Sequence, residues 1–419
     1  MRNAAFILLA LLLSPVLAHA QKLLVPMDKA QTDHLKAYGL TFWCLQDPRA
    51  YPCEWLLNYR CGAFVLPDSP DVRARAREMS VAVEAVTETA LRRIYATIDA
   101  ENMERIALAR APRVAVYIPP DRQPWDDAVT LALTYAEIKY DKVWDTEVLA
   151  GKLKDYDWLH LHHVDFTGQF GKFFSAFGQE PWYRKQVATA QETAVQLGFS
   201  RVQDLKAAVA TEVARWVKGG GFLFAMCLAA DSIDVALAAR GIDIVPPQID
   251  GTPADPAADS KLRFGDCFAF KNFHLVSNPY STEISTINVT PDKALISRGQ
   301  TFQLFEFSAK QDPILTMLTQ DHVNAVHDFL GQATSFRRSV LKDTVTVMGD
   351  FPGEDRVKYI HGDYGQGTFT FYGGHDPEDY AHFVGQQPTD LSKHPHSPGY
   401  RLILNNVLFP AAKTKERKT

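Results

Sequence analysis

Short apolar blocks alternate with segments of helical periodicity through the middle of the chain. Blocks of consecutive apolar residues, typical of strands buried on both faces, predict strands at 114–118, 156–163, 222–226 and 242–245. Apolar residues recurring every three or four positions predict helices at 125–138, 182–197, 202–217 and 231–240. Repeated strand–helix alternation predicts an α/β fold with a doubly wound, mostly parallel sheet.

The beginning of the mature chain shows the same alternation on a smaller scale. Residues 22–27 and 53–59 are strand-like, and residues 32–44 between them have helical spacing, which predicts a βαβ unit. No G-x-G-x-x-G loop follows the first of these strands. A dinucleotide-binding fingerprint is therefore excluded.

Beyond residue 245 the pattern becomes irregular and then recovers. Residues 246–343 carry short β-like runs, among them 302–305, and one helical segment near 321–330, which predicts an insertion. Strands resume at 344–348, 357–361 and 368–372, the last two as a hairpin, and 398–408 predicts a closing helix. The predicted organisation is a leader at 1–20, one α/β domain over 21–245 and 344–412, the insertion at 246–343, and a basic tail at 413–419.

The first twenty residues have the composition of a secretory signal. Arg2 precedes an apolar run, and Ala18-His19-Ala20 offers an A-x-A cleavage site before Gln21. We therefore expect a periplasmic or extracellular protein with no transmembrane segment in its mature chain. The formal net charge of −5 and the lack of long basic runs argue against nucleic acid as a partner, so we expect a small-molecule substrate.

Five cysteines remain after removal of the leader, and three of them lie close together in the sequence: Cys44, Cys53 and Cys61. In an oxidising compartment these three predict at most one disulfide, with Cys227 unpaired.

The stretch 219–231 places Cys227 between a predicted strand and a predicted helix. Ala225 and Ala229 are small enough for strand and helix to approach closely, which is the layout of a nucleophile elbow. The positive end of the following helix favours a thiolate, whereas Asp231 opposes it. A buried structural cysteine is the alternative reading of the same pattern.

A group of histidines marks the end of the predicted strand 156–163. His160 and His162 share one face of that strand, whereas His163 points to the other, and Asp165 follows. His160 and His162 could ligate a divalent metal with Asp165 or His375 as a third ligand. The alternative is a polar pocket in which these rings are hydrogen-bonded and no cofactor is needed.

Residues 216–222 (WVKGGGF), which lead into the elbow, and residues 365–375 (GQGTFTFYGGH) resemble the class I glutamine amidotransferase-like superfamily, with its ThuA-like branch nearest. Residues 22–59 and 156–169 are similar to an exported bacterial family whose members are often labelled asparagine synthetase B. An N-terminal catalytic cysteine and a Ser-Gly-Gly-x-Asp-Ser loop, both found in true asparagine synthetases, are missing, so the residues do not support that activity.

The resemblance implies a flavodoxin-like fold with Cys227 as nucleophile, His375 as its base and Glu378 as the acid that orients the ring. Glu378 lies three residues after the histidine, whereas the family has two. The pocket would also include His162 and Asp165, and backbone N–H groups of Leu228, Thr167 and Gly168 would hold an oxyanion.

Three functions remain open at this point: a thiol hydrolase of amide or acyl bonds, a non-covalent ThuA-like protein that binds or processes a carbohydrate-type small molecule, and a non-catalytic envelope protein. An aromatic pocket rim of Trp158, Phe166, Phe170 and Tyr372 would favour the carbohydrate.

Overall fold

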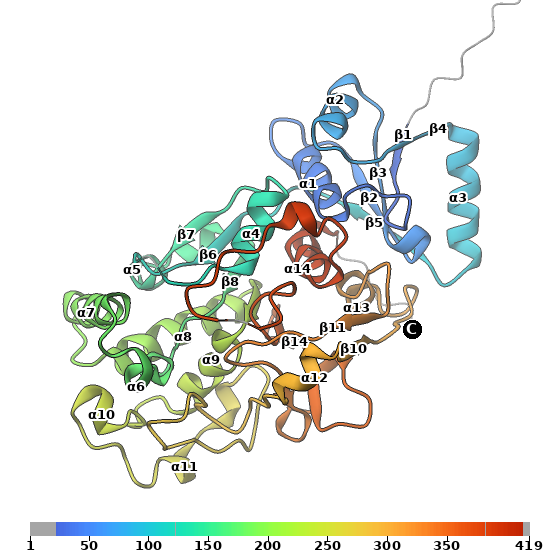
Figure 1. Ribbon diagram of the computed structural model, residues 1–419. Helices are drawn as coiled ribbons and strands as arrows, with labels where there is room; N and C mark the ends of the chain where they lie inside the picture. Colours follow the sequence, from blue (N-terminus) through green and yellow to red (C-terminus); the bar gives the residue numbers. More distant parts are fainter. Residues whose placement is uncertain (1–21, 122, 382, 414–419) are drawn as a thin grey trace, which may run out of the picture.

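The computed structural model describes residues 22–121, 123–381 and 383–413, and it contains two β-sheets (Figure 1). The predicted leader and almost all of the predicted tail lie outside these residues. Within the described ranges no helix has both the length and the apolar character needed to cross a membrane.

The first sheet is antiparallel, and its strands are β1 (Lys22–Val25), β2 (Cys53–Leu57), β3 (Ala63–Pro67), β4 (Glu84–Val86) and β5 (Glu104–Leu108), in the order β4-β1-β3-β2-β5. The predicted βαβ unit at its start is present in a split form, since β1 and β2 are parallel to each other but β3 lies between them. A tight turn in which Asn58, Arg60, Cys61 and Gly62 have positive φ returns the chain at once, so β3 pairs antiparallel with both β1 and β2.

Two helices cover this first sheet. Helix α1 (His34–Leu45) packs in the same core as Leu23, Trp55 and Phe64, on one face of the sheet. Helix α3 (Glu88–Ala100) packs with Leu24, Leu56 and Val65, on the other face. The period-2 alternation of the strands thus supplies two separate apolar layers.

The second sheet has ten strands and is mixed. A parallel part runs in the order β7-β6-β8-β9-β15, and its strands are β6 (Val114–Tyr117), β7 (Asp141–Val143), β8 (Trp158–Leu161), β9 (Phe222–Met226) and β15 (Gly367–Tyr372). Antiparallel strands extend it beyond β15, namely β14 (Arg356–Tyr364), β13 (Thr346–Asp350), β10 (Thr301–Leu304) and β11 (Ala325–His327), while β12 (Phe336–Arg337) pairs with β14. The α/β class is confirmed, as a large mixed sheet with parallel and antiparallel parts.

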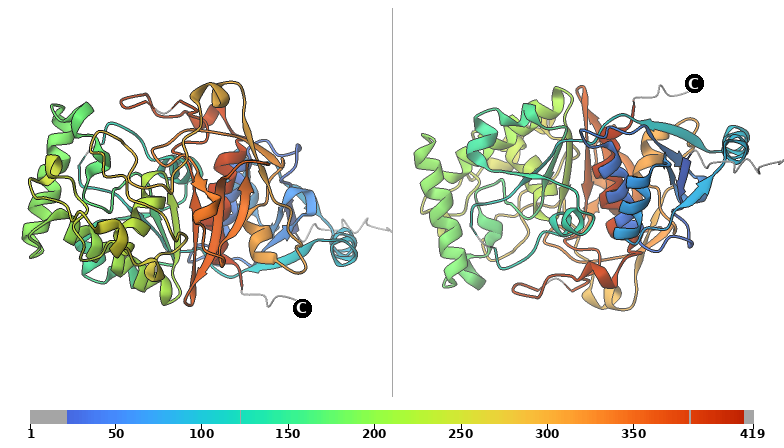
Figure 2. Two further views of the ribbon diagram at one scale, coloured as in Figure 1. Left: turned by 90° about the horizontal axis from the view of Figure 1, so that it is seen from below. Right: turned by 90° about the horizontal axis from the view of Figure 1, so that it is seen from above.

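Helices lie on both sides of the parallel strands (Figure 2). Leu159, Leu223 and Ala225 share a core with α8 (Val202–Lys218) and α9 (Leu228–Ala238). Trp158 and Phe224 are the sequence neighbours of Leu159 and Leu223 and therefore point to the opposite face of the sheet. They pack in the core that holds α1, α4 (Ala128–Tyr135) and α14 (Pro398–Leu408). Helix α14 contacts both α1 and α4, so it joins the two sheets.

The remaining described helices are α2 (Pro70–Glu78), α5 (Asp145–Leu149), α6 (Phe174–Phe177), α7 (Pro181–Gln196), α10 (Pro247–Asp250), α11 (Ala258–Lys261), α12 (Lys293–Ser297) and α13 (Pro313–Leu318). The closing helix at 398–408 and the hairpin between β14 and β15 are confirmed.

Two elements in and near the insertion differ from the sequence prediction. Residues 242–245 form no strand, because the Gln203 side chain occupies the backbone groups that a neighbouring strand would pair, accepting from Ile244 N–H and donating to Ile242 C=O. The predicted helix at 321–330 is replaced by strand β11, which pairs antiparallel with β10. Tertiary pairing here overrides the local pattern.

Candidate functional site

The carboxyl ends of β9 and β15 bring Cys227 and His375 to one edge of the sheet. The strands are parallel neighbours, with Met226 paired to Tyr372, and Cys227 N–H donates to Gly374 C=O over 3.1 Å. Both residues therefore leave the sheet at the same edge.

Cys227 has the backbone conformation of an elbow. Its φ of 50° and ψ of −141° fall in a region that residues with a side chain rarely occupy, and helix α9 begins at the next residue. The amide of Ala229 donates to His162 C=O over 2.7 Å, which fixes the start of α9 against the end of β8. Hydrogen bonds to the residues that follow β8 and β15, the two neighbours of β9, therefore hold the strained backbone of Cys227 in place.

The sulfur of Cys227 is enclosed. The residue is 1% exposed, and Sγ accepts a hydrogen bond from Gln332 N–H over 3.3 Å. Burial raises the pKa of the thiol to about 11, against a lowering by the N–H groups of Gln332, Leu228 and Ala333, while the Asp231 carboxyl raises it further. The start of α9 favours the thiolate through Leu228 N–H, as expected, but burial outweighs all the backbone donors together.

A turn from the insertion covers the sulfur. Leu330 C=O accepts from His375 N–H, and Ala333 C=O accepts from Gly374 N–H, both over 2.8 Å. The buried Lys358 ammonium donates to the carbonyls on both sides of this turn, Phe329 at 2.6 Å and Thr334 at 2.9 Å. The sequence predicted no role for the turn, because its pairing partners lie in β14 and β15.

Three histidine rings form a buried chain that runs back into the sheet. His375 Nδ1 lies 3.0 Å from His162 Nε2, and His162 Nδ1 lies 3.2 Å from His160 Nε2. His160 Nδ1 lies 3.0 Å from the carbonyl oxygen of Phe224. Because a carbonyl only accepts, His160 carries its proton on Nδ1 when neutral, and its Nε2 accepts from His162 Nδ1–H. The Nε2 of neutral His162 then accepts from His375 Nδ1–H.

Asp127 adds a negative charge beside this chain. Its Oδ1 lies 3.5 Å from His160 Nε2 and 3.6 Å from His162 Nδ1, and it also accepts from the first backbone N–H groups of α4. Burial raises the pKa of this carboxyl, but attraction to His162 and His160 in their protonated forms more than offsets that and holds it well below its usual range. Asp127 was missed in the sequence, where its only signal is a helix-capping position before an apolar run.

His163 lines a cleft. The expectation that it points away from His162 is wrong, because β8 ends at Leu161 and one nitrogen of each ring lies within 4.8 Å of the other. The cleft has a volume of about 510 Å³, and its walls include Trp125, Asp126, Asp127 and His163. The His163 ring lies 5.3 Å from that of His162 and 6.1 Å from that of His375, centroid to centroid. His163 is half-buried, so it lies between the buried histidine chain and the cleft.

Other residues predicted for the site lie elsewhere or brace loops. Asp165 accepts from the N–H groups of Thr167 and Gly171, both over 2.7 Å, and thus caps its own loop. A side chain at Gly168 would meet the Gln203 backbone at 2.8 Å, so this glycine packs against α8. Glu378 pairs with His394 over 2.9 Å, whereas the ring of His375 has His162 as its partner.

The four aromatic side chains expected at a pocket rim are buried. Trp158, Phe166 and Tyr372 are each 0% exposed and belong to the core, whereas Phe170, 8% exposed, lines a small cavity beside His163 and Asp165. The rim prediction is wrong for the first three, because blocks of apolar residues beside a site look the same in sequence whether they line it or pack beneath it.

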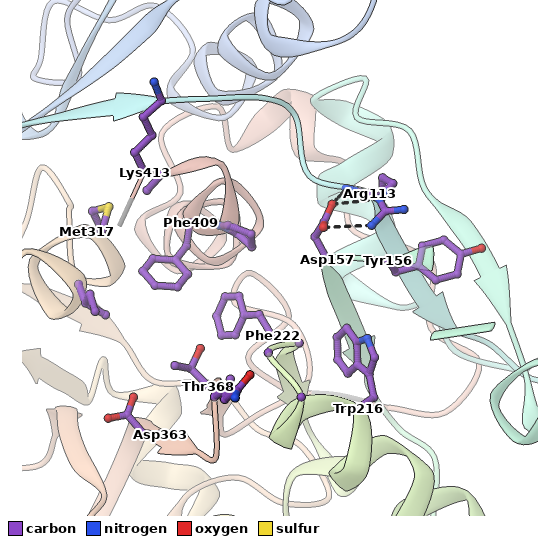
Figure 3. A pocket seen from close by; sticks show the side chains of 18 of the residues that line it. Arg113, Tyr156, Asp157, Trp216, Phe222, Met317, Asp363, Thr368, Phe409 and Lys413 are labelled. Atoms are coloured by element: carbon purple, nitrogen blue, oxygen red, sulfur yellow. Dashed lines mark hydrogen bonds and ion pairs between the residues drawn. The ribbon is translucent and has the colours of Figure 1, made fainter. Parts of the chain in front are cut away.

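A larger cavity of about 800 Å³ opens at the opposite edge of the sheet, at the amino ends of β9 and β15 (Figure 3). Phe222, Thr368 and Phe409 line it, and the Arg113–Asp157 ion pair closes one side. It lacks the histidines and the elbow, and ligands of open α/β sheets bind at the carboxyl ends of the strands. We therefore place the candidate site at the smaller cleft lined by Asp127 and His163, which we call the histidine cleft.

No family model and no curated protein matches this chain. Two solved structures, Cytoplasmic Protein STM3548 from Salmonella typhimurium and Cytoplasmic Protein STM1381 from Salmonella typhimurium LT2, each align over 72% of this chain and 100% of their own. Both are 11% identical with a TM-score of 0.35.

Proposed function

We propose that the protein converts a small polar molecule by acid–base chemistry in the histidine cleft, without forming a covalent intermediate on Cys227. The observation that carries this proposal is that His163 lines a 510 Å³ cleft and one of its ring nitrogens lies within 4.8 Å of a nitrogen of both His162 and His375. Clefts of this size suit small-molecule ligands. The substrate class is a molecule with an amide, acyl or glycosidic bond that water can cleave.

His163 is the residue of this cluster that touches the substrate. A neutral imidazole at the wall takes a proton from a water molecule in the cleft, and that water attacks the bond. The positive charge that develops on His163 is stabilised by the nearby Asp127 carboxylate, which lines the same cleft. The proton is then available for the leaving group.

The alternative is a thiol hydrolase with Cys227 as nucleophile and His375 as base, and the strained elbow at Cys227 favours it. Leu228 N–H, which is directed at the sulfur, would then bind an oxyanion. This reaction would require the turn 330–333 to move away and the thiol to lose its proton, both against the contacts described above.

We also propose membership of the class I amidotransferase-like superfamily, in its ThuA-like branch. The parallel strands, numbered by their order in the chain, lie side by side as 2-1-3-4-5, the order of flavodoxin-like folds, and this supports the proposal. Export to the periplasm or the medium is proposed from the A-x-A site alone.

A substrate screen with three proteins tests the proposed function. Nitrophenyl esters, nitroanilides, nitrophenyl glycosides, glutamine and asparagine are offered to wild type, His163→Ala and Cys227→Ala. We expect a fall of at least about 100-fold in kcat/KM for His163→Ala, the range of general acid–base catalysis, and little change for Cys227→Ala. The reverse pattern would overturn the proposal and establish the thiol hydrolase.

A further inference from the structure

We propose that His162, His163 and His375 bind one divalent transition-metal ion, with Zn²⁺ preferred, at the wall of the cleft. This inference rests on the proposed function, the cleavage of a bond by activated water in the cleft, and changes one step of it. With the ion bound, His163 is a ligand and no longer the base, and water on the ion loses its proton to solvent instead. It replaces the pair expected from the sequence, His160 and His162, with a different set of ligands.

The spacing of the ring nitrogens suits a metal ion. One nitrogen from each of the three rings lies within 4.8 Å of the others, and His162 Nε2 and His375 Nδ1 are 3.0 Å apart. Two imidazole nitrogens on a tetrahedral Zn²⁺ at about 2.0–2.1 Å are separated by roughly 3.3 Å. A small movement of the rings therefore opens a position for the ion.

The buried chain behind the ligands prepares the correct lone pair. Phe224 C=O fixes the proton of His160 on Nδ1, and His160 Nε2 in turn fixes the proton of His162 on Nδ1. The lone pair of His162 Nε2 then faces His375 Nδ1, 3.0 Å away. The ion would replace the hydrogen bond between these two nitrogens, with the proton of His375 on Nε2. Ligating histidines in proteins are commonly oriented in this way by a hydrogen bond from the other ring nitrogen.

A second group, formed by Asp127, His160 and His162, has a comparable spacing but is less suited to bind an ion. Asp127 Oδ1 already accepts from Val129 N–H and Thr130 N–H, and His160 is 0% exposed with Nδ1 bonded to a carbonyl. Both groups reach the cleft, one through His163 and the other through Asp127, but Asp127 Oδ1 is already occupied by two backbone N–H groups. We assign Asp127 and His160 to the support of the ligands.

The chemistry of the ligand set indicates the kind of ion. Three neutral imidazoles favour Zn²⁺ over Mg²⁺ or Ca²⁺, which prefer oxygen ligands. Three protein ligands leave one tetrahedral position for a water molecule, and the position of His163 directs it toward the cleft. Bound Zn²⁺ lowers the pKa of such a water to about 7, so hydroxide is available near neutral pH.

Metal titration of the full chain tests the assignment directly. Protein stripped with a chelator and dialysed is titrated with Zn²⁺ by calorimetry and with Co²⁺ by visible absorption, which reports the ligand geometry. We expect one ion per chain and tetrahedral Co²⁺ absorption in wild type. In His163→Ala and His375→Ala we expect an affinity reduced more than the 10- to 100-fold that loss of an outer-shell partner produces. His274→Ala, an exposed histidine elsewhere, should match wild type.

Each contrary result has a defined meaning. Absence of binding in wild type, or equal affinity in wild type, His163→Ala and His375→Ala, would overturn the metal site. Turnover by fully stripped protein that still depends on His163 would overturn the metal site while the proposed function survives. Stoichiometric binding that depends on the three histidines would support the site even if no substrate in the screen were converted, and in that case only the proposed function would fail.

Discussion

His162 Nε2 lies 3.0 Å from His375 Nδ1, although 213 positions separate the two residues in the chain. The contact passes over the end of β9, since β8 and β15 are its neighbours on either side. Cys227, at the end of β9, faces α9, whereas His160 stacks on Phe224 toward the opposite face of the sheet. The elbow and the histidine chain are therefore neighbours that point in different directions.

The thiol of Cys227 should react slowly with iodoacetamide near neutral pH. Burial raises its pKa to about 11, so little thiolate is present below pH 9, and the turn 330–333 restricts access. Peptide mapping after timed alkylation measures the rate at each cysteine, with unfolded protein as the control in which all five react. A fast reaction at pH 7 would favour the thiol hydrolase.

Gly331→Ala should displace the turn that covers Cys227. A Cβ at this position would lie 2.7 Å from the Gly374 carbonyl carbon and 2.8 Å from the His375 nitrogen. We expect a loss of stability of about 1–3 kcal/mol and faster alkylation of Cys227. Gly265→Ala, where a Cβ meets open space, is the matched control, and denaturant unfolding with peptide mapping compares the two. Equal behaviour of the two variants would mean that the turn does not hold the sulfur.

Acid should destabilise the protein through His34. Burial lowers the pKa of this ring to about 3, and the charge of Arg401 and the neighbouring His322 lower it further. In the unfolded chain the pKa returns to about 6.5, so the unfolded state binds more protons between these values, and the free energy of unfolding falls as the pH drops below 6.5. The total effect on this free energy is up to about 5 kcal/mol.

Denaturant titrations at several pH values compare wild type with His34→Asn. The variant should lose most of the slope between pH 6 and pH 4, whereas His274→Asn, at an exposed position, should keep it. Equal slopes in all three proteins would contradict the assignment to His34.

Lys206→Met should destabilise the protein more than removal of both partners of its ion pair. Lys206 Nζ lies 2.9 Å from Asp145 Oδ2, and both side chains are buried, at 4% and 0% exposure. Loss of the ammonium alone leaves a buried carboxylate and should reduce the free energy of unfolding by roughly 3–5 kcal/mol. Lys206→Met with Asp145→Leu should be less destabilised, and thermal unfolding of the two variants decides the order.

The sequence predicts well those elements whose own pattern determines them. Helix α14 and the hairpin between β14 and β15 lie where the apolar spacing places them, and so do the buried strands β8 and β9. The sequence does not predict an element whose backbone hydrogen bonds are made by residues far away in the chain. Gln203 converts the apolar run 242–245 into a loop, and β10 draws residues 325–327 into a strand.

The candidate site shows the same limit. Alternation along β8 places His160 and His162 together, and two parallel strands bring His375 to them. Asp127 and the turn 330–333 were not predicted, because a capping aspartate and a loop carbonyl carry no pattern that reports their spatial neighbours.

The five cysteines are all free thiols in the structure, and no bridge joins Cys44, Cys53 and Cys61.

The intact mass of the wild-type protein during turnover tests the central claim most directly. A substrate found by the screen is mixed with the protein, the reaction is quenched in acid at steady state, and the mass is compared with that of protein without substrate. An uncatalysed thiol adduct is controlled for with Cys227→Ala. We predict an unchanged mass, since activated water attacks the substrate in the histidine cleft. An acyl group found on Cys227 at steady state would contradict the account.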